Sequence, residues 1–228
     1  MSALLSSRQK PRLSSPVCVP SVDPEFNPVA YLGARQERRF VVGITGPPGA
    51  GKSTFATWLV AKLGASSIVL PMDGFHLSNA QLDARGLRAR KGAPDTYDVG
   101  GFQDVLRRLR TDAEVRAPAY SRVTHEPEAD AICIAPSHRI VIVEGNYLLV
   151  DEPPWTDVKA ELDAVWYLDI SPEVAAERLR KRHMSVGRSL EEAEGKVNTV
   201  DLPNGEVVRA TRSRADRWLE ADSGTYKP

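Results

Sequence analysis

Cysteine is scarce in this 228-residue sequence, and long hydrophobic runs are missing from it. Its two cysteines, Cys18 and Cys133, lie far apart and show neither metal-ligand spacing nor the pattern of a disulfide framework. We interpret Cys133, inside the apolar run 131–135, as a small buried side chain rather than a reactive thiol. No stretch approaches the roughly 20 apolar residues of a membrane span, and the start lacks the apolar core of a secretory signal. We therefore expect a cytoplasmic protein that has no membrane partner.

Neither sign of charge is in excess. Thirty Lys and Arg side chains balance 30 Asp and Glu side chains, which gives a formal net charge of zero. The bulk positive field that draws proteins to nucleic acids is therefore missing, and we expect no nucleic-acid partner. Hydrophobic residues make up 42% of the chain, a fraction that suits one large globular domain with a sizeable core.

The chain divides into three segments. Residues 1–24 are rich in Ser, Pro and Arg and have no helical or strand periodicity, which indicates a flexible leader. Residues 25–38 carry apolar side chains at helical spacing, and we predict a short docking helix there. The catalytic domain then covers residues 39–228.

Short apolar runs alternate with amphipathic segments in this domain. Buried strands are predicted at 40–44, 67–70, 140–143 and 165–170. The other predicted elements are helices at 55–63, 76–84, 101–111 and 172–184, a strand pair within 115–135 and a turn at 201–205. Continuous apolar strands separated by helices are typical of a parallel sheet covered on both faces. The predicted fold class is therefore α/β, with a doubly wound parallel sheet.

A phosphate-binding loop is the most specific motif in the sequence. Residues 46–53 match the pattern G-x-x-x-x-G-K-[ST], also called Walker A, and they stand between a buried strand and an amphipathic helix. Glycines let successive backbone N–H groups surround phosphates, and the helix N-terminus adds its positive end. Lys52 is expected to contact the β- and γ-phosphates, and Ser53 to ligate Mg²⁺. The predicted nucleotide contacts are Gly46, Gly49, Ala50, Gly51, Lys52, Ser53 and Thr54.

Two carboxylates follow predicted strands. Asp73 comes directly after the second strand, at the carboxyl edge where ligands bind in open α/β folds. A carboxylate there can accept the proton of an attacking hydroxyl, although an Asx turn with Gly74 is the structural alternative. Glu144 ends the third strand, and a carboxylate at that tip is expected to hold Mg²⁺.

A basic segment occupies the predicted helix 172–184. Most of its cations are expected to face solvent. Arg178 and Arg182 are four residues apart and share one face of the helix. We predict that one or both close over the phosphates and stabilise the charge that develops on the transferring group.

Six ordered pieces of sequence together resemble one branch of the P-loop kinases. They are GPPGAGKST, PMDGFH, RKGAPDTYD, APAYSRVTHEP, EGNYLL and ERLRKRH. The set resembles the uridine kinase, type I pantothenate kinase and phosphoribulokinase branch, most closely its bacterial nucleoside/nucleotide kinase members. The resemblance implies a P-loop NTPase fold with a mobile basic lid, and ATP and Mg²⁺ as cofactors. It also supports Asp73 as the catalytic base and Glu144 at the metal.

The same resemblance implies residues for the acceptor and the adenine. Tyr120 and His125 correspond to the tyrosine and histidine that uridine kinases place against their nucleoside. Asn204, in the predicted turn, is implied to contact the adenine. The expected acceptor contacts are His76, Lys91, Tyr97, Tyr120 and His125, and packing or surface roles are the alternative for each.

The function predicted from these observations is transfer of the γ-phosphate of ATP to a hydroxyl of a small molecule, with Asp73, Lys52, Arg178 and Arg182 as catalytic residues. The sequence does not identify the acceptor, because PMDGFH departs from the uridine kinase pattern and RKGAPDTYD resembles the pantothenate kinase branch. A nucleoside, a pantothenate-like alcohol or a sugar each presents a suitable hydroxyl. The alternatives are a nucleoside-monophosphate kinase and a nucleotide-binding or nucleotide-hydrolysing regulatory protein. Since many relatives form dimers or tetramers, a homo-oligomer is compatible with the resemblance.

Overall fold

A five-stranded parallel sheet forms the centre of the protein. The computed structural model describes residues 26–221, so the predicted leader at 1–24 and Cys18 lie outside the described residues. The strands follow the order β2-β5-β1-β6-β7, and each neighbouring pair is parallel. Their bounds are β1 Phe40–Thr45, β2 Ser67–Pro71, β5 Ile140–Glu144, β6 Ala164–Asp169 and β7 Arg217–Glu220. The predicted parallel α/β sheet is confirmed.

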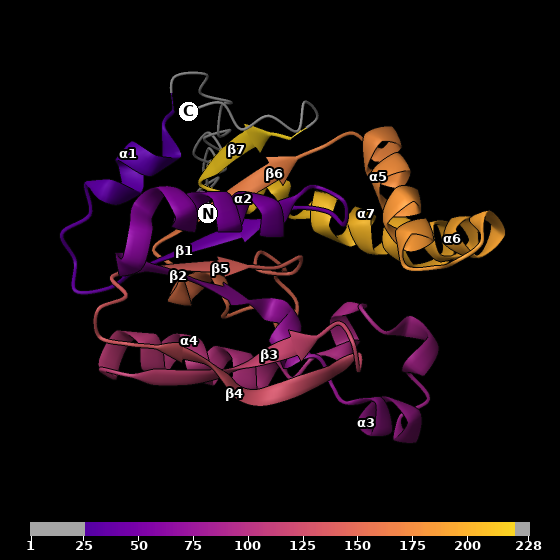
Figure 1. The fold of residues 1–228 in the computed structure, drawn as a ribbon, viewed down its shortest axis with the longest axis horizontal. Coiled ribbons are helices and arrows are strands. Elements are labelled where there is room, and N and C mark those ends of the chain that lie inside the picture. The colour runs from indigo at the N-terminus through magenta and orange to yellow at the C-terminus, as the bar shows by residue number, and fades with distance from the viewer. Residues whose placement is uncertain (1–25, 222–228) are drawn as a thin grey trace, which may run out of the picture.

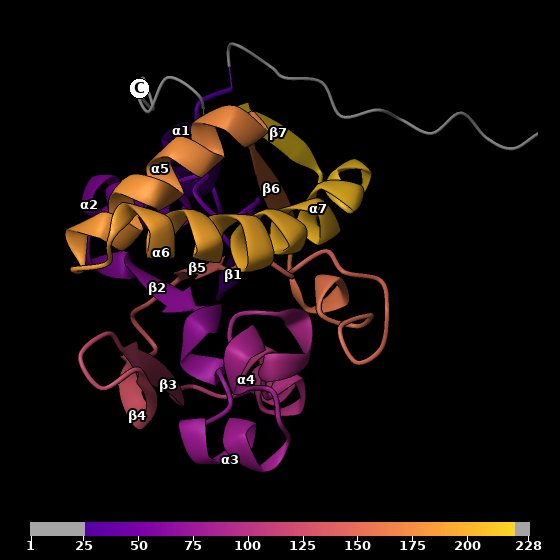
Figure 2. The same cartoon turned by 90° about the vertical axis from the view of Figure 1, so that its right-hand side faces the viewer.

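Helices cover both faces of this sheet (Figures 1 and 2). Strand β1 is buried along its whole length, and its pleat sends Val42 into one hydrophobic cluster and Val41 into the other. The first cluster includes side chains of α1 Pro28–Gly33, α2 Lys52–Leu63 and α5 Pro172–Ser185. The second includes α4 Val99–Thr111 and α7 Leu202–Ala210. Within residues 26–221, no helix has the length and apolar character needed to cross a membrane.

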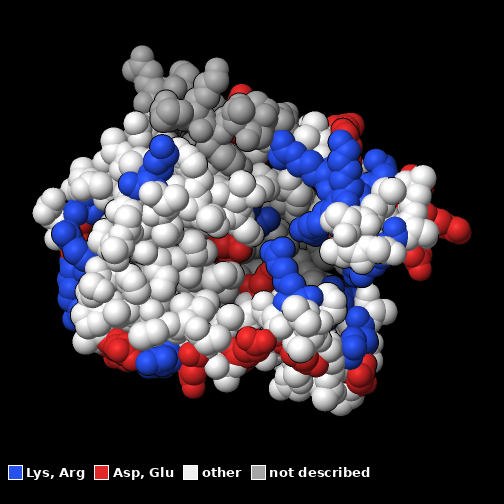
Figure 3. Space-filling view, viewed as in Figure 1, with Lys and Arg blue, Asp and Glu red and all other residues white. Residues whose placement is uncertain are grey.

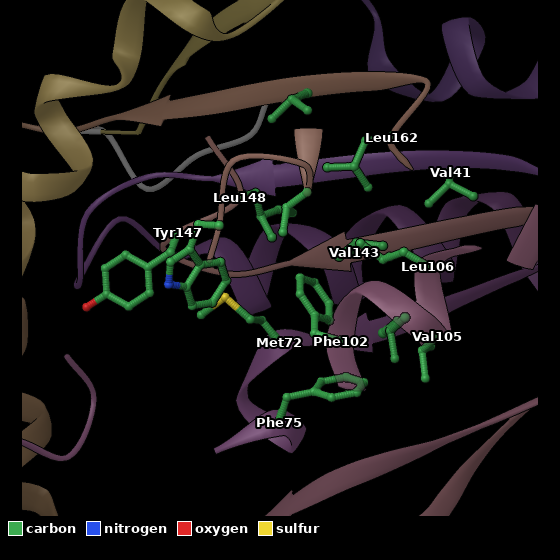
Figure 4. Packing of buried hydrophobic residues seen from close by; sticks show 14 of the residues in the cluster. Val41, Met72, Phe75, Phe102, Val105, Leu106, Val143, Tyr147, Leu148 and Leu162 are labelled. Atoms are coloured by element: carbon green, nitrogen blue, oxygen red, sulfur yellow. The ribbon is translucent and has the colours of Figure 1, made fainter. Parts of the chain in front are cut away.

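The second cluster also fixes the turn that follows β2. Met72 and Phe75 are buried in it, and Phe75 packs against Phe102 of α4 with ring centroids 5.0 Å apart (Figure 4). These two residues are the ends of the 3₁₀ turn Met72–Phe75, whose second residue is Asp73. Because both ends of the turn are packed in the core, the position of Asp73 is set by the core rather than by a free loop.

A separate β-hairpin projects beside the sheet. Strands β3 Val115–Ser121 and β4 Glu126–Ile134 pair antiparallel, which confirms the strand pair predicted within 115–135. In Figure 1 the hairpin lies with α3 Asn79–Ala84 and α4 on one side of the sheet. At Gly74 the hairpin backbone comes so close that a Cβ would stand 2.2 Å from the carbonyl oxygen of Pro118. Only glycine fits there, so Gly74 lets the hairpin pack onto the turn that carries Asp73.

On the side of the molecule away from the hairpin, α5 is followed by α6 Leu190–Lys196, a π-helical turn Val197–Asp201 and α7 (Figure 2). The turn predicted at 201–205 is therefore wrong, because these residues are helical. Pro203 lies in the first turn of α7, where a missing N–H is tolerated, and the π turn just before it accommodates the interrupted hydrogen-bond ladder. Gly205 faces the phosphate loop, with an ideal Cβ 3.7 Å from Pro47.

One further boundary differs from the prediction. The helix predicted at 76–84 begins only at Asn79, after Ser78 caps it in a reciprocal capping box with Gln81. The residues before it cannot be helical because His76 forms an antiparallel β-bridge with Tyr97. In the segment predicted as a docking helix, α1 spans six residues and buries Leu32.

Candidate active site

The phosphate loop connects β1 to α2. Gly49 and Gly51 have φ values of 85° and 87°, and Gly51 is the N-cap of α2. A Cβ at Gly46 would lie 2.5 Å from the carbonyl oxygen of Leu168. These positions require glycine, and the loop they form leaves the N-terminus of a 12-residue helix facing the cleft. Unpaired N–H groups and the helix dipole make this end an anion site.

Lys52 is the buried cation of this loop. Its side chain is 9% exposed, and Nζ donates to the carbonyl oxygens of Gly46 at 2.9 Å and Pro47 at 3.0 Å. An ammonium has three donors, so one N–H is left for a phosphate oxygen. Burial lowers the pKa of Lys52 to about 8, although the negative charges of Glu144 and Asp73 oppose that shift. Both predicted carboxylates are thus electrostatic neighbours of the lysine.

Ser53, at the start of α2, contacts Glu144, at the end of β5, because β5 is the parallel neighbour of β1. Ser53 Oγ donates a hydrogen bond of 2.9 Å to Glu144 Oε1, and Glu144 is 7% exposed at the tip of β5. Burial and the nearby charge of Asp73 raise the pKa of Glu144, whereas Lys52 lowers it. A buried carboxylate beside a hydroxyl is a suitable oxygen donor pair for Mg²⁺.

Metal ligation by protein atoms alone is not supported. Among residues 26–221 there is no group of three or more His, Cys, Asp or Glu side chains that could hold a metal ion. Mg²⁺ usually keeps several waters and binds through one or two protein oxygens together with substrate phosphates. The pair of Ser53 and Glu144 beside the phosphate loop fits that mode.

Asp73 lies two residues beyond Pro71, which is the β2 partner of Glu144 in the sheet register. Its Oδ1 is 3.5 Å from the hydroxyl of Tyr97, a long hydrogen bond. Burial and the charge of Asp73 raise the pKa of Tyr97 well above its ordinary value, so Tyr97 stays a neutral donor. The structure therefore brings Asp73, Glu144 and Lys52 to one edge of the sheet, where the sequence predicts them.

An aromatic wall stands next to Asp73. The ring of His76 lies 4.1 Å from that of Tyr97 and 4.8 Å from that of Tyr120, measured between centroids. The Nδ1 atom of His76 is 2.8 Å from the carbonyl oxygen of Asp73. Burial lowers the pKa of His76, so the ring is neutral at neutral pH. Three of the five predicted acceptor contacts thus form one cluster beside the predicted base, in which Tyr97 is buried and His76 and Tyr120 are half-buried.

Lys91 and His125 meet in a different way. Lys91 Nζ donates to the His125 carbonyl oxygen at 2.6 Å and to Asn79 Oδ1 at 2.7 Å. The contact with His125 is made by its backbone, which is in the left-handed region at φ 55°. Lys91 therefore connects the hairpin tip to the start of α3, and the His125 side chain is exposed.

The two predicted lid arginines occupy different environments on α5. Arg178 donates to the carbonyl oxygens of Ala221 at 2.9 Å and Gly49 at 3.5 Å, so it touches the phosphate loop. Arg182 is exposed, and its charge contributes to the lowered pKa of Lys52, which places it near the loop. Of the other residues of the basic segment, Lys181 is exposed and pairs with Glu177, whereas Arg180, which pairs with Glu194, is half-buried and His183 is buried.

Two further predicted nucleotide contacts are Thr54 and Asn204. Thr54 is exposed on α2 and lines a shallow hollow of about 490 Å³ with Thr57 and Trp58. Asn204 lies in α7 instead of a turn, and its amide donates to the carbonyl oxygen of Gly92 at 3.3 Å. That contact ties α7 to the segment 90–98.

Sequence reasoning missed several residues that shape the site. Tyr147 donates to the carbonyl oxygen of Gly92 at 2.6 Å, and the charge of Arg122 lowers the pKa of Glu144. His183 is buried on α5, and its Nε2 atom is 2.6 Å from Asp201 Oδ2. All three stand in motifs quoted above, Tyr147 in EGNYLL, His183 in ERLRKRH and Arg122 in APAYSRVTHEP, but the motifs alone do not assign them a role.

Figure 3 shows the result as a cleft with acidic side chains at its floor and basic side chains on both sides. A glycine loop at a helix N-terminus, a buried lysine and a serine–carboxylate pair at the carboxyl edge of a parallel sheet define a P-loop protein. The chain belongs to the Phosphoribulokinase / Uridine kinase family, whose family model matches residues 41–220. It is thus a P-loop kinase of that type.

Individual relatives agree with this assignment. A "Putative uridine kinase" of Schizosaccharomyces pombe is 36% identical over 187 residues, which cover 77% of this chain and 79% of the relative. The protein YggC of Escherichia coli is 35% identical over 196 residues, which cover 83% of this chain and 81% of the relative. A crystal structure titled "putative fructose transport system kinase", from Silicibacter sp. TM1040, is 37% identical. It covers 84% of this chain and 98% of its own, with a TM-score of 0.78.

Proposed function

We propose that the protein transfers the γ-phosphate of MgATP to a hydroxyl group of a small molecule. The observation that carries this proposal is the cluster of Lys52, the Ser53–Glu144 pair and Asp73 at one edge of the sheet. A protein that only binds or hydrolyses a nucleotide needs Lys52 and the Ser53–Glu144 pair. A carboxylate placed between the phosphate loop and a separate aromatic wall is the additional feature that an acceptor requires.

Each residue has a role in this proposal. Lys52 neutralises phosphate charge, while Ser53 and Glu144 hold Mg²⁺, which when bound offsets the negative charge of the phosphates. The oxygen of the acceptor hydroxyl forms a new bond to the γ-phosphorus, and the bond between that phosphorus and the ADP oxygen breaks. Asp73 accepts the proton that the hydroxyl loses. Tyr97 steadies the Asp73 carboxylate, and the lid arginines stabilise the transferring group.

The names of the relatives suggest acceptors with hydroxyl groups. The Schizosaccharomyces pombe relative is named after uridine and the Silicibacter structure after fructose, and a nucleoside and a sugar both carry hydroxyls. The wall formed by His76, Tyr97 and Tyr120 gives such a molecule flat apolar faces and polar edges. We place the acceptor against this wall.

The experiment that tests the proposal measures label transfer from [γ-³²P]ATP in the presence of Mg²⁺ to pools of candidate acceptors. Acceptor-dependent label well above hydrolysis in buffer alone supports it. Lys52→Ala serves as the inactive control because it removes the buried cation of the loop. Hydrolysis that no acceptor pool changes, at the same rate as in buffer, would contradict it.

A further inference from the structure

Most cations around the cleft are already paired within the protein. Arg88 pairs with Asp83 at 3.0 Å, Arg90 pairs with Asp95 at 3.1 Å, and Lys91 donates to two protein oxygens. Within the described residues 26–221, Arg122 and Arg182 have no hydrogen-bond or ion-pair partner for their guanidinium groups. Arg182 is on the lid, on the nucleotide side. Arg122 is on the hairpin, on the acceptor side.

The hairpin directs Arg122 toward the cleft. Ser121, which precedes it, is the last residue of β3 and pairs with Glu126. One residue earlier, Tyr120 turns its ring toward His76 on the aromatic wall. Arg122 follows β3 directly as the first residue of the turn 122–125. The influence of its charge on Glu144 agrees with a side chain that reaches toward the cleft floor.

The far end of the turn 122–125 is tied to α3, although the Arg122 guanidinium has no partner among the described residues. The Glu126 carboxylate accepts from the backbone N–H of Asn79 at 3.0 and 3.1 Å, and Lys91 bridges Asn79 to the carbonyl oxygen of His125. These contacts tie the hairpin tip to the N-terminus of α3. The turn that carries Arg122 is thus anchored at its far end, and a ligand has to order only the Arg122 side chain itself.

The charges of the cleft indicate which ligand suits it. Asp73 and Glu144 make the floor negative, and the phosphates of a nucleotide add to this, so an anionic acceptor needs a cation of its own. A guanidinium offers donors in a planar fork that matches a carboxylate or a phosphate. An uncharged nucleoside or sugar would leave Arg122 without a partner.

We propose that Arg122 is the specificity-determining residue of the acceptor site and binds a carboxylate or phosphate group on the molecule whose hydroxyl is phosphorylated. This inference rests on the proposed function. His76, Tyr97 and Tyr120 then contact the uncharged part of the acceptor, while Arg122 holds its anionic end away from Asp73. Its effect belongs to acceptor binding, in contrast to that of Lys52 and Arg182, which lie with the nucleotide.

The test gives the wild-type protein four acceptor pools with [γ-³²P]ATP: uncharged nucleosides, uncharged sugars and polyols, sugar phosphates, and hydroxy or sugar acids. We expect label in one of the two anionic pools, and the pool that is labelled distinguishes phosphate from carboxylate. With the best acceptor, Arg122→Gln should raise the acceptor KM by about 10- to 100-fold, the effect of losing one charge-assisted hydrogen bond. The KM for ATP should change far less, and Arg122→Lys should restore part of the loss.

Arg116→Gln is the matched control. It removes the same charge from the same hairpin, at an exposed arginine of β3 that pairs with Glu114. Arg116 is six residues before Arg122, which corresponds to about 20 Å at about 3.3 Å per residue. It should leave the acceptor KM at the wild-type value. If label appears only in the uncharged pools and Asp73→Asn abolishes it, the proposed function stands but the inference that Arg122 binds an anionic acceptor is wrong. A loss of kcat in Arg122→Gln with an unchanged acceptor KM would place Arg122 on the γ-phosphate and overturn it too. No transfer to any pool would contradict the proposed function itself.

Discussion

Ser53 and Glu144, 91 positions apart in the sequence, meet through a 2.9 Å hydrogen bond at the carboxyl edge of the sheet. The pairing of β1 with β5 produces this contact, because it aligns Ile44 with Glu144 just before the phosphate loop begins. The charges of Glu144 and Asp73 both act on Lys52, and the charges of Asp73 and Lys52 both act on Glu144. In the proposed function, metal binding and proton transfer both depend on this one electrostatic cluster.

Glu144→Gln should weaken Mg²⁺ binding while the protein still folds. The amide keeps the size of the side chain and can still accept from Ser53, but it has no charge for Mg²⁺. We expect kcat to fall by about 100-fold or more, with partial recovery as the Mg²⁺ concentration rises. Steady-state rates over a range of Mg²⁺ concentrations measure this. A rate and Mg²⁺ dependence equal to the wild type would remove Glu144 from the metal site.

Nucleotide affinity should depend on the protonation of Lys52. Burial lowers its pKa to about 8, so the free protein loses the ammonium charge as the pH rises above that value. Phosphates favour the charged form, and ADP binding at higher pH therefore takes up a proton. The Kd for ADP without metal should rise by up to about tenfold per pH unit above pH 8.

Calorimetric titrations at about pH 7 and about pH 9 measure this dependence. Lys52→Met should bind ADP weakly and without the pH dependence, and Lys62→Ala, on the exposed last turn of the same helix, should behave as the wild type. Equal affinity of the wild type at both pH values would be the contrary result.

Arg182→Ala should reduce turnover without loosening the fold. The side chain is exposed on α5 and makes no hydrogen bond or ion pair with any described residue, so its removal breaks no internal contact. Because it lies near the phosphate loop, we expect kcat to fall by about 100-fold or more, as for other arginines that stabilise a transferring phosphoryl group. Arg180→Ala, which removes a cation paired with Glu194, is the control and should change kcat little. Similar kcat values for the two variants would exclude a special role for Arg182.

The segment from α5 to α7, which we propose as the lid, should be stabilised by the buried contact between His183 and Asp201. These side chains lie 2.6 Å apart, and Arg188 Nη1 is 2.7 Å from the other nitrogen of the ring. His183→Ala leaves a buried carboxylate without this partner, which costs about 1–3 kcal/mol. We expect a lower Tm and a larger share of ATP hydrolysed without transfer, because an unsteady lid admits water. An unchanged Tm would show that the contact does not stabilise the lid.

Much of the sheet and the phosphate loop could be predicted because their signals are local. The apolar run 40–44 and the glycines of 46–53 are neighbours in sequence, and the pattern itself states the strand, the loop and the helix start. Asp73 and Glu144 follow apolar strands directly. In a parallel sheet this places them at the same edge.

The remaining features depend on contacts between distant segments. The helix boundary at Asn79 is set by the bridge of His76 to Tyr97, and residues 201–205 are helical although their sequence favours a turn. Gly205 and Val208 of this helix are buried, so tertiary packing outweighs the local preference. Similarly, nothing in the sequence near Lys91 shows that its ammonium is bound by Asn79 and the backbone of His125.

Asp73→Asn tests the central claim most directly. The amide keeps the shape of the side chain and the turn packed between Met72 and Phe75, but it cannot accept a proton. The measurement compares acceptor phosphorylation and ATP affinity in the variant and the wild type. We predict that ATP binds with nearly the same Kd while phosphoryl transfer falls by about 100- to 10,000-fold, the range of general-base catalysis. Transfer at the wild-type rate would contradict the assignment of Asp73 as the base and, with it, this account of the site.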